Sequence, residues 1–296
     1  MSFEPPRPRP SDRLPGRPID DPETQPPHQP LDGAALRAAL AGRVGQLDVV
    51  AVTGSTNADL LAAARTGAGD RTVLVAERQD RGRGRLDRQW LSAPGSGLTF
   101  SVLFRPERVP AGRLGWLPLL TGLSVVRAIG DLCDVEVALK WPNDVLLGPE
   151  QAKGAGILAE AEPRAPGGLA VVVGIGINVG AQADELPEGG TSLVAQGAGV
   201  GRSELLLRVL RRLLTDEADW RDAAGDPDAT GLREGYRAAC ATLGREVRVS
   251  LPAGAGLVGH ALDLDVDGRL MVREAAGTVR TVAAGDIVHL RALPGH

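Results

Sequence analysis

Three apolar runs joined by short links constrain the fold of this chain most strongly. They cover residues 137–147, 156–161 and 169–177, and the connections between them are rich in Gly, Pro and charged residues. Strands joined by short links pair in antiparallel fashion, whereas parallel strands need long crossovers. The runs therefore predict an antiparallel meander. Two further runs, at 71–77 and 97–105, have the apolar and β-branched composition of buried strands.

Helical patterns flank these strands in the sequence. The segment Ser55-Thr56-Asn57 suits a helix N-cap, because such side chains accept an unpaired backbone N–H, and we expect a helix over Ala58–Arg65 after it. A strand is predicted at Gln46–Thr53. Other helices are predicted at 33–42, 114–133, 202–220 and 231–243. The fold class is thus α+β, with a mixed, mostly antiparallel sheet flanked by helices.

The pattern changes at both ends of the chain. After Gly244, short strands separated by turn signals such as Asp267-Gly268 predict a small all-β barrel. These strands are expected at 246–251, 256–265, 269–273, 278–283 and 287–290. The first thirty residues are rich in proline and polar side chains, which is typical of a disordered tail. We therefore expect a tail over 1–32, a large domain over 33–243 and a small domain over 244–296.

Composition excludes several classes of protein. The net charge of -4 argues against a general nucleic-acid binder. The chain contains no run of about 18 apolar residues, which a membrane span would need, and its N-terminus lacks the apolar core of a signal peptide. A cytoplasmic protein is therefore expected. Cys133 and Cys240 are expected to be reduced thiols, and the four histidines lack zinc-ligand spacing.

The segment 79–90 (QDRGRGRLDRQW), between two predicted strands, has the composition of an anion-binding loop. Glycine lets backbone N–H groups approach an anion, and arginine supplies paired donors to carboxylate or phosphate. The composition favours binding of a small anion, although by itself the segment could also be a solvated basic loop or an RNA-binding Arg-Gly run.

Three further motifs carry polar side chains at strand ends or turns. They are KWPNDV at 140–145, KGAGIL at 153–158 and GIGINV at 174–179. Each alone could be an ordinary turn or strand end. The chain has neither the G-x-G-x-x-G start of a Rossmann helix nor a P-loop sequence, so neither nucleotide-binding fold is expected.

Together with GSTN at 54–57, these motifs closely resemble the biotin protein ligase family in order and spacing. The resemblance covers about residues 46–180 and implies a class II synthetase-like catalytic domain, followed by a small SH3-like domain. It implies that ATP and biotin are substrates, with Mg²⁺, and that biotin is activated as biotinyl-5′-AMP. The product would be a biotinylated lysine on the biotin carboxyl carrier protein of a carboxylase.

The resemblance also implies roles for matching residues. Those lining the biotin pocket would be Ser55, Thr56, Asn57, Gln79 and Gly156. Those holding the biotin carboxylate and the α-phosphate, and so catalysing activation, would be Arg83, Arg85 and Lys153. Those on the ATP or adenylate side would be Arg88, Trp90, Asn143, Asn178 and Arg291. Asp144 is the candidate for accepting a proton from the attacking lysine or orienting its amine.

Two positions depart from the family's loop pattern. Arg81 stands where a small residue is usual, and Asp87 stands where glycine is usual. Arg81 adds charge, whereas Asp87 needs a backbone conformation open to a non-glycine residue or aspartate's tolerance for positive φ.

Other functions remain as alternatives. Lipoate–protein ligases share the fold but lack this combination of motifs, and a non-catalytic biotin-binding regulator would need fewer of the cations. Some members of the family carry an N-terminal winged-helix domain, but residues 1–32 leave no room for one, so a DNA-binding repressor is not expected. A monomer or weak homodimer that binds neither nucleic acid nor membrane is expected.

Overall fold

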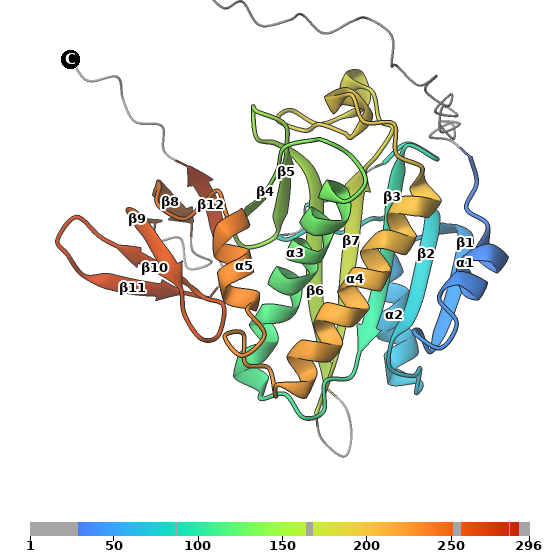
Figure 1. Ribbon diagram of the computed structural model, residues 1–296, viewed down its shortest axis with the longest axis horizontal. Coiled ribbons are helices and arrows are strands. Elements are labelled where there is room, and N and C mark those ends of the chain that lie inside the picture. The colour runs from blue at the N-terminus through green and yellow to red at the C-terminus, as the bar shows by residue number, and fades with distance from the viewer. Residues whose placement is uncertain are drawn as a thin grey trace, which may run out of the picture.

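The computed structural model describes residues 29–86, 88–90, 92–163, 168–250, 256–283 and 285–289 (Figure 1). Its larger part is a seven-stranded sheet in the order β1-β2-β3-β7-β6-β5-β4. The strands are β1 (Gln46–Thr53), β2 (Thr72–Gln79), β3 (Gly97–Phe104), β4 (Val137–Lys140), β5 (Asp144–Leu147), β6 (Ala152–Pro163) and β7 (Leu169–Asn178). The helices are α1 (Gly33–Ala39), α2 (Thr56–Arg65), α3 (Trp116–Gly130), α4 (Arg202–Asp222) and α5 (Leu232–Ala239).

The topology confirms a mixed, mostly antiparallel sheet. β1 and β2 pair in parallel because α2 provides the crossover between them. The other neighbouring strands in this sheet are antiparallel, including the predicted meander β5-β6-β7. In Figure 1, α3 and α4 cover one face of the sheet and α2 covers the other. All eight residues of β3 are buried as a result, which agrees with its mostly apolar sequence.

The structure differs from the sequence expectation at several element boundaries. Residues 137–147 form two antiparallel strands in which Lys140 pairs with Asp144, and a tight turn with a cis Trp141–Pro142 peptide joins them. The turn places Asn143 and Asp144 at one edge of the hairpin. The helix expected from residue 114 begins at Trp116, because the preceding residues form the 3₁₀ turn η1 (Ala111–Gly115).

Helix α2 begins two residues earlier than expected. Ser55 is its N-cap, and the Ser55 hydroxyl accepts a hydrogen bond from the backbone N–H of Ala58 at 3.4 Å. Thr56 and Asn57 consequently lie in the first turn, where both side chains are buried against the sheet. The capping segment thus directs two polar side chains into the protein.

A second, five-stranded sheet follows, which confirms the expected all-β C-terminal part. Its order is β11-β10-β9-β8-β12, and all its pairs are antiparallel. The strands are β8 (Glu246–Ser250), β9 (Gly256–Leu264), β10 (Leu270–Arg273), β11 (Val279–Val282) and β12 (Asp286–His289). Two buried indoles tie it to the large part: Trp116 donates to the carbonyl of Val266 and Trp141 to that of Gly268.

Most of the proline-rich tail lies outside the described residues, so the domain boundaries stay predictions. The first described residues pack onto the body through an ion pair between buried Arg202 and partly buried Glu77, whose atoms lie 2.7 Å apart. Arg202 also donates to the carbonyl of Gln29, and the backbone N–H of Leu31 donates to Glu77.

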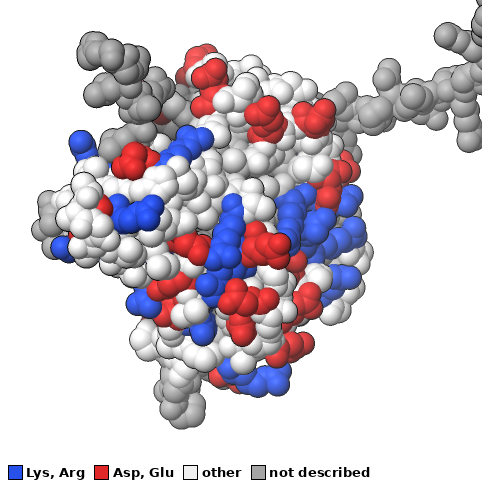
Figure 2. Space-filling model, turned by 60° about the vertical axis from the view of Figure 1, so that its left-hand side comes forward, with Lys and Arg blue, Asp and Glu red and all other residues white. Residues whose placement is uncertain are grey.

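Charge is dispersed over α4 and its neighbours. In the view of Figure 2, Lys and Arg side chains lie among Asp and Glu side chains. Ion pairs account for part of this mixture, because Asp131 lies 2.7 Å from Arg212 and 3.6 Å from Arg208. In the part of the chain that the structure describes, no helix has the length and apolar character needed to cross a bilayer.

Candidate active site

One cavity of about 600 Å³ opens over β6 and β7, beside the loop that precedes β3. Its volume suits a small-molecule ligand. The structure brings these predicted site residues together in its lining: Ser55, Thr56, Asn57, Gln79, Arg83, Arg85, Arg88, Trp90, Asn143, Asp144, Lys153, Gly156 and Asn178. Arg291 and Asp87 lie outside the described residues. Arg81 is exposed and turns toward Gly54, so it does not line the cavity.

The floor of the cavity is a pair of glycines under an indole. Gly156 on β6 pairs with Gly176 on β7, and the ring of Trp90 lies against both. A Cβ on Gly176 would lie 2.3 Å from Trp90 Cε2, and one on Gly156 would lie 3.2 Å from Cζ3. Both positions therefore need glycine for the ring to approach the sheet this closely.

Hydroxyl and amide groups form a connected network at one end of the cavity. The backbone N–H and the hydroxyl of Thr56 donate to Gln79 Oε1, at 2.8 and 3.0 Å. Ser101 Oγ, fully buried on β3, lies 2.7 Å from Thr56 Oγ1 and 2.6 Å from Asn57 Oδ1. Ser101 was not predicted as a site residue, because a serine inside an apolar strand has no local signature of function.

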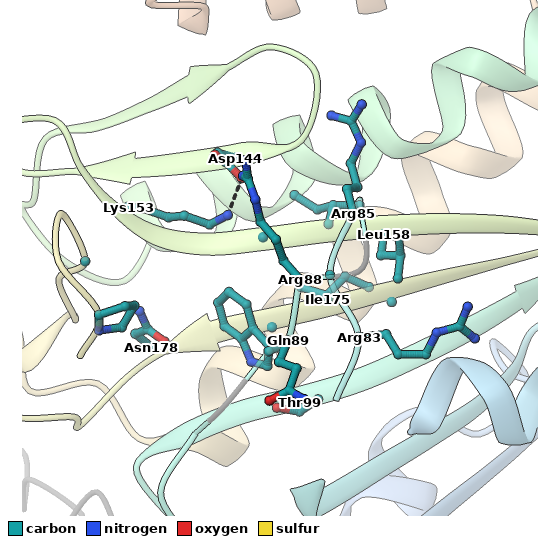
Figure 3. A pocket seen from close by; sticks show the side chains of 18 of the residues that line it. Arg83, Arg85, Arg88, Gln89, Thr99, Asp144, Lys153, Leu158, Ile175 and Asn178 are labelled. Carbon is teal, nitrogen blue, oxygen red and sulfur yellow. Dashed lines mark ion pairs between the residues drawn. The ribbon is translucent and has the colours of Figure 1, made fainter. Parts of the chain in front are cut away.

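The basic loop folds back on itself as a short hairpin. The N–H of Trp90 donates to the carbonyl of Gly82 at 3.0 Å, and the N–H of Gly84 donates to that of Arg88 at 2.7 Å. A Cβ on Gly82 would lie 2.2 Å from the Trp90 carbonyl oxygen, so glycine permits the closure. The hairpin places Arg83, Arg85 and Arg88 around the cavity (Figure 3).

Arg85 connects the loop to two other parts of the chain. Its guanidinium donates to Asn143 Oδ1 at 2.9 Å and to the carbonyl of Gly285, in the small sheet, at 3.1 Å. Asn143 in turn donates to the carbonyl of Ile157 on β6 at 3.2 Å. The turn of the KWPND motif is thereby fixed beside the arginine loop.

Lys153 and Asp144 form an ion pair at the other end of the cavity. Lys153 Nζ lies 2.6 Å from Asp144 Oδ1 and 6.0 Å from the centre of the Trp90 ring (Figure 3). The pair is partly exposed, so a ligand can reach it. This arrangement puts one ammonium group and one carboxylate next to the indole.

Two sets of residues in or beside the cavity have no counterpart in the sequence expectation. Asp184, Glu185 and Glu188 line the cavity from the segment after β7, which pairs with Lys153 through Gly190. Glu160 on β6 lies 2.8 Å from Arg83, beside the cavity. Asn178, which was predicted, is buried and donates to the carbonyl of Thr191 at 2.9 Å.

The cavity can hold two anionic groups side by side. Four cationic side chains reach it from two directions, three on the arginine loop and Lys153 on β6. The neutral network offers donors and acceptors to an uncharged ring at one end. Such a set can bring a carboxylate and a phosphate together and stabilise the negative charge that concentrates between them.

Two family models match the chain. The model described as the biotin/lipoate A/B protein ligase family matches residues 49–178, and that described as the biotin protein ligase C terminal domain matches residues 242–290. Over 271 residues, the chain is 44% identical to the biotin–[acetyl-CoA-carboxylase] ligase of Mycobacterium tuberculosis, covering 88% of this chain and 97% of that protein. It is 32% identical to the bifunctional ligase/repressor BirA of Bacillus subtilis, covering 81% of this chain and 72% of that protein.

A solved structure is similar in fold as well as sequence. The biotin protein ligase from Aquifex aeolicus, in complex with biotin and ATP, matches with a TM-score of 0.68 and 30% identity, covering 84% of this chain and 100% of that chain. Sequence, fold and cavity therefore indicate the same family. The chain belongs to the biotin protein ligase family.

Proposed function

We propose that this protein is an ATP-dependent ligase that activates biotin as biotinyl-5′-AMP and transfers it to a lysine of a biotin carboxyl carrier protein. The observation that carries the proposal is the single cavity in which a neutral hydrogen-bonding network, an indole on a glycine floor and four cations meet. The Aquifex relative is described in complex with both proposed substrates.

In the first step, the biotin carboxylate attacks the α-phosphorus of ATP and pyrophosphate leaves. A carboxylate is already ionised near pH 7, so the step needs no general base. It needs cations that bring two anions together, and Arg83, Arg85 and Lys153 are the proposed suppliers. Positioning and electrostatic stabilisation would then provide most of the rate enhancement.

Mg²⁺ is proposed to reach the cavity with ATP. Mg²⁺ keeps several waters and is usually held by one or two carboxylates together with substrate phosphates. Within the described ranges, no three His, Cys, Asp or Glu side chains are grouped to hold a metal ion. Single carboxylates do line the cavity, at Asp144, Asp184 and Glu188, which fits a cation carried mainly on the phosphates, where it would neutralise charge on the leaving group.

In the second step, the amine of a carrier lysine attacks the mixed anhydride and AMP leaves. A free lysine has a pKa of about 10.4 and must lose a proton before it attacks. Asp144 is the proposed acceptor of that proton, or the group that orients the amine, because its carboxylate already holds an ammonium group, that of Lys153, at 2.6 Å. The carrier lysine would replace Lys153 at this carboxylate.

The proposed partner is the carrier protein or domain of a biotin-dependent carboxylase. The Mycobacterium relative is named for ligation to acetyl-CoA carboxylase, which supports this acceptor class. A cytoplasmic location, a monomer or weak homodimer, and the absence of nucleic-acid and membrane binding stay predictions.

Incubation with biotin, ATP and a purified carrier domain tests the proposal. Mass spectrometry should show one biotinyl group on the carrier, and none on a carrier whose acceptor lysine is replaced by arginine. Modification with lipoate alone would instead identify a lipoate–protein ligase. Biotin binding without modification of the carrier would identify a non-catalytic regulator.

A further inference from the structure

Glu160 on β6 contacts two residues at the biotin end of the cavity, one on the basic loop and one at the start of α2. Its Oε1 lies 2.8 Å from Arg83 Nη2 on the basic loop. Its Oε2 accepts a hydrogen bond from Asn57 Nδ2, at the start of α2, at 2.9 Å. One mostly buried carboxylate therefore touches both a cation and an amide assigned to the ligand pocket.

Asn57 is held in place by its surroundings, so it gives the Glu160 carboxylate a fixed hydrogen-bond partner. The Asn57 amide also donates to the carbonyl of Leu158 at 3.0 Å, and its oxygen lies 2.6 Å from Ser101 Oγ. A Cβ on Gly174 would lie 2.2 Å from Asn57 Oδ1, so the amide is packed against bare backbone. Asn57 is 4% exposed and has no space to turn.

Among the residues that the structure describes, the Arg83 side chain has no comparable set of contacts beyond its pair with Glu160. The side chain is half exposed and extends from the paired arm of the hairpin, where Arg83 bridges Gln89, at the end of the cavity away from the Asp144–Lys153 pair (Figure 3). A free arginine side chain samples many rotamers, and ordering it opposes ligand binding. The contact with Glu160 uses Nη2, so the remaining N–H groups of the guanidinium can still donate to an anion.

We infer that Glu160 is a positioning residue, which holds Arg83 ready for the biotin carboxylate and anchors it to the buried Asn57 network. The inference rests on the proposed function, because it assigns Arg83 a biotin carboxylate as its ligand. Because Arg83 is proposed to hold the biotin carboxylate against the α-phosphate, loss of the Glu160 carboxylate should weaken biotin binding and slow activation together.

Glu160→Gln tests the inference with little change in shape. The amide oxygen can still accept from Asn57, but the neutral group no longer pairs with Arg83. Because the pair is half exposed, we expect biotin affinity by calorimetry to fall by about five-fold. The KM for biotin should rise equally, and kcat for pyrophosphate exchange should fall by a similar factor, because Arg83 is also proposed to bring the two anions together.

Glu162→Gln is the matched control. Glu162 lies two residues along the same strand and pairs with Arg65 at 2.7 Å, outside the cavity lining. The Glu162→Gln variant loses a comparable ion pair, so its biotin affinity should equal that of the unsubstituted chain.

A double-mutant cycle separates positioning from a structural role. If Glu160 acts through Arg83, Glu160→Gln should cause no further loss once Arg83 is gone. The double variant Arg83→Ala/Glu160→Gln should then bind biotin with the same affinity as the single variant Arg83→Ala. Additive losses, or an unchanged affinity in Glu160→Gln, would overturn the inference while leaving the proposed function intact. An unsubstituted chain that binds no biotin would overturn the proposed function and this inference with it.

Discussion

Gly176→Ala should displace the Trp90 indole that lies on the glycine floor of the cavity. The added Cβ would lie 2.3 Å from Trp90 Cε2 and 2.5 Å from Nε1. Carbon atoms in contact prefer about 3.5–4.0 Å, so the ring must move by more than about 1 Å. A displacement of about 1 Å near reacting groups can cost roughly 10²-fold in rate.

We therefore expect kcat/KM for biotin-dependent pyrophosphate exchange to fall about 100-fold, equivalent to about 2.7 kcal/mol. Tryptophan emission should shift as well. Trp116, Trp141 and Trp220 are at most 2% exposed, so a change in emission reports mainly on Trp90. Thermal unfolding should change little, because the cavity is open to solvent and the ring can move outward.

Gly130→Ala provides the control for adding a methyl group. No heavy atom lies within 4 Å of a Cβ at Gly130, at the end of α3. This variant should keep the exchange rate and emission of the unsubstituted chain. Gly176→Ala with an unchanged rate and unchanged emission would refute the reasoning that the indole rests on these glycines.

Three further predictions follow from the same structure. Lys153→Met should slow pyrophosphate exchange by about 10²–10³-fold, because one cation near the developing charge is lost; a loss below ten-fold would contradict this role. Asp144→Asn should spare exchange and slow transfer to the carrier, measured in single turnover from preformed adenylate; equal loss in both steps would exclude a specific role in transfer. Burial and the nearby Lys140 and Arg245 lower the pKa of His289 from 6.5 to about 4. Protons then bind the unfolded chain preferentially, so stability should fall as the pH drops from about 6.5 to about 4. His289→Gln should flatten that dependence in thermal unfolding, and an unchanged slope would assign it to other groups.

The strands and helices could be predicted because their signals are local. The strand at Gln46–Thr53 has the predicted bounds, and the β-branched runs at 71–77 and 97–105 correspond to β2 and β3 within two residues. The reversal inside 137–147 could not be predicted by apolar pattern alone. It depends on a tight turn at Pro142 and on pairing of Lys140 with Asp144, which hydrophobic periodicity does not encode.

The candidate site likewise has residues that could be predicted from the sequence and residues that could not. Its motif residues could be identified from order and spacing, and the described ones line one cavity. The supporting residues could not, because their importance depends on contacts far apart in sequence. Ser101 reads as one more residue of a buried strand, and Glu160 reads as an ordinary polar position. Only the folded sheet places both of them against Asn57.

Biotin-dependent exchange of labelled pyrophosphate into ATP, with lipoate as a parallel substrate, tests the central claim most directly. The reaction isolates the first step, so it needs no knowledge of the carrier. Exchange with biotin and not with lipoate is the predicted result. Exchange with lipoate alone, or with neither acid, would contradict the claim that this cavity activates biotin.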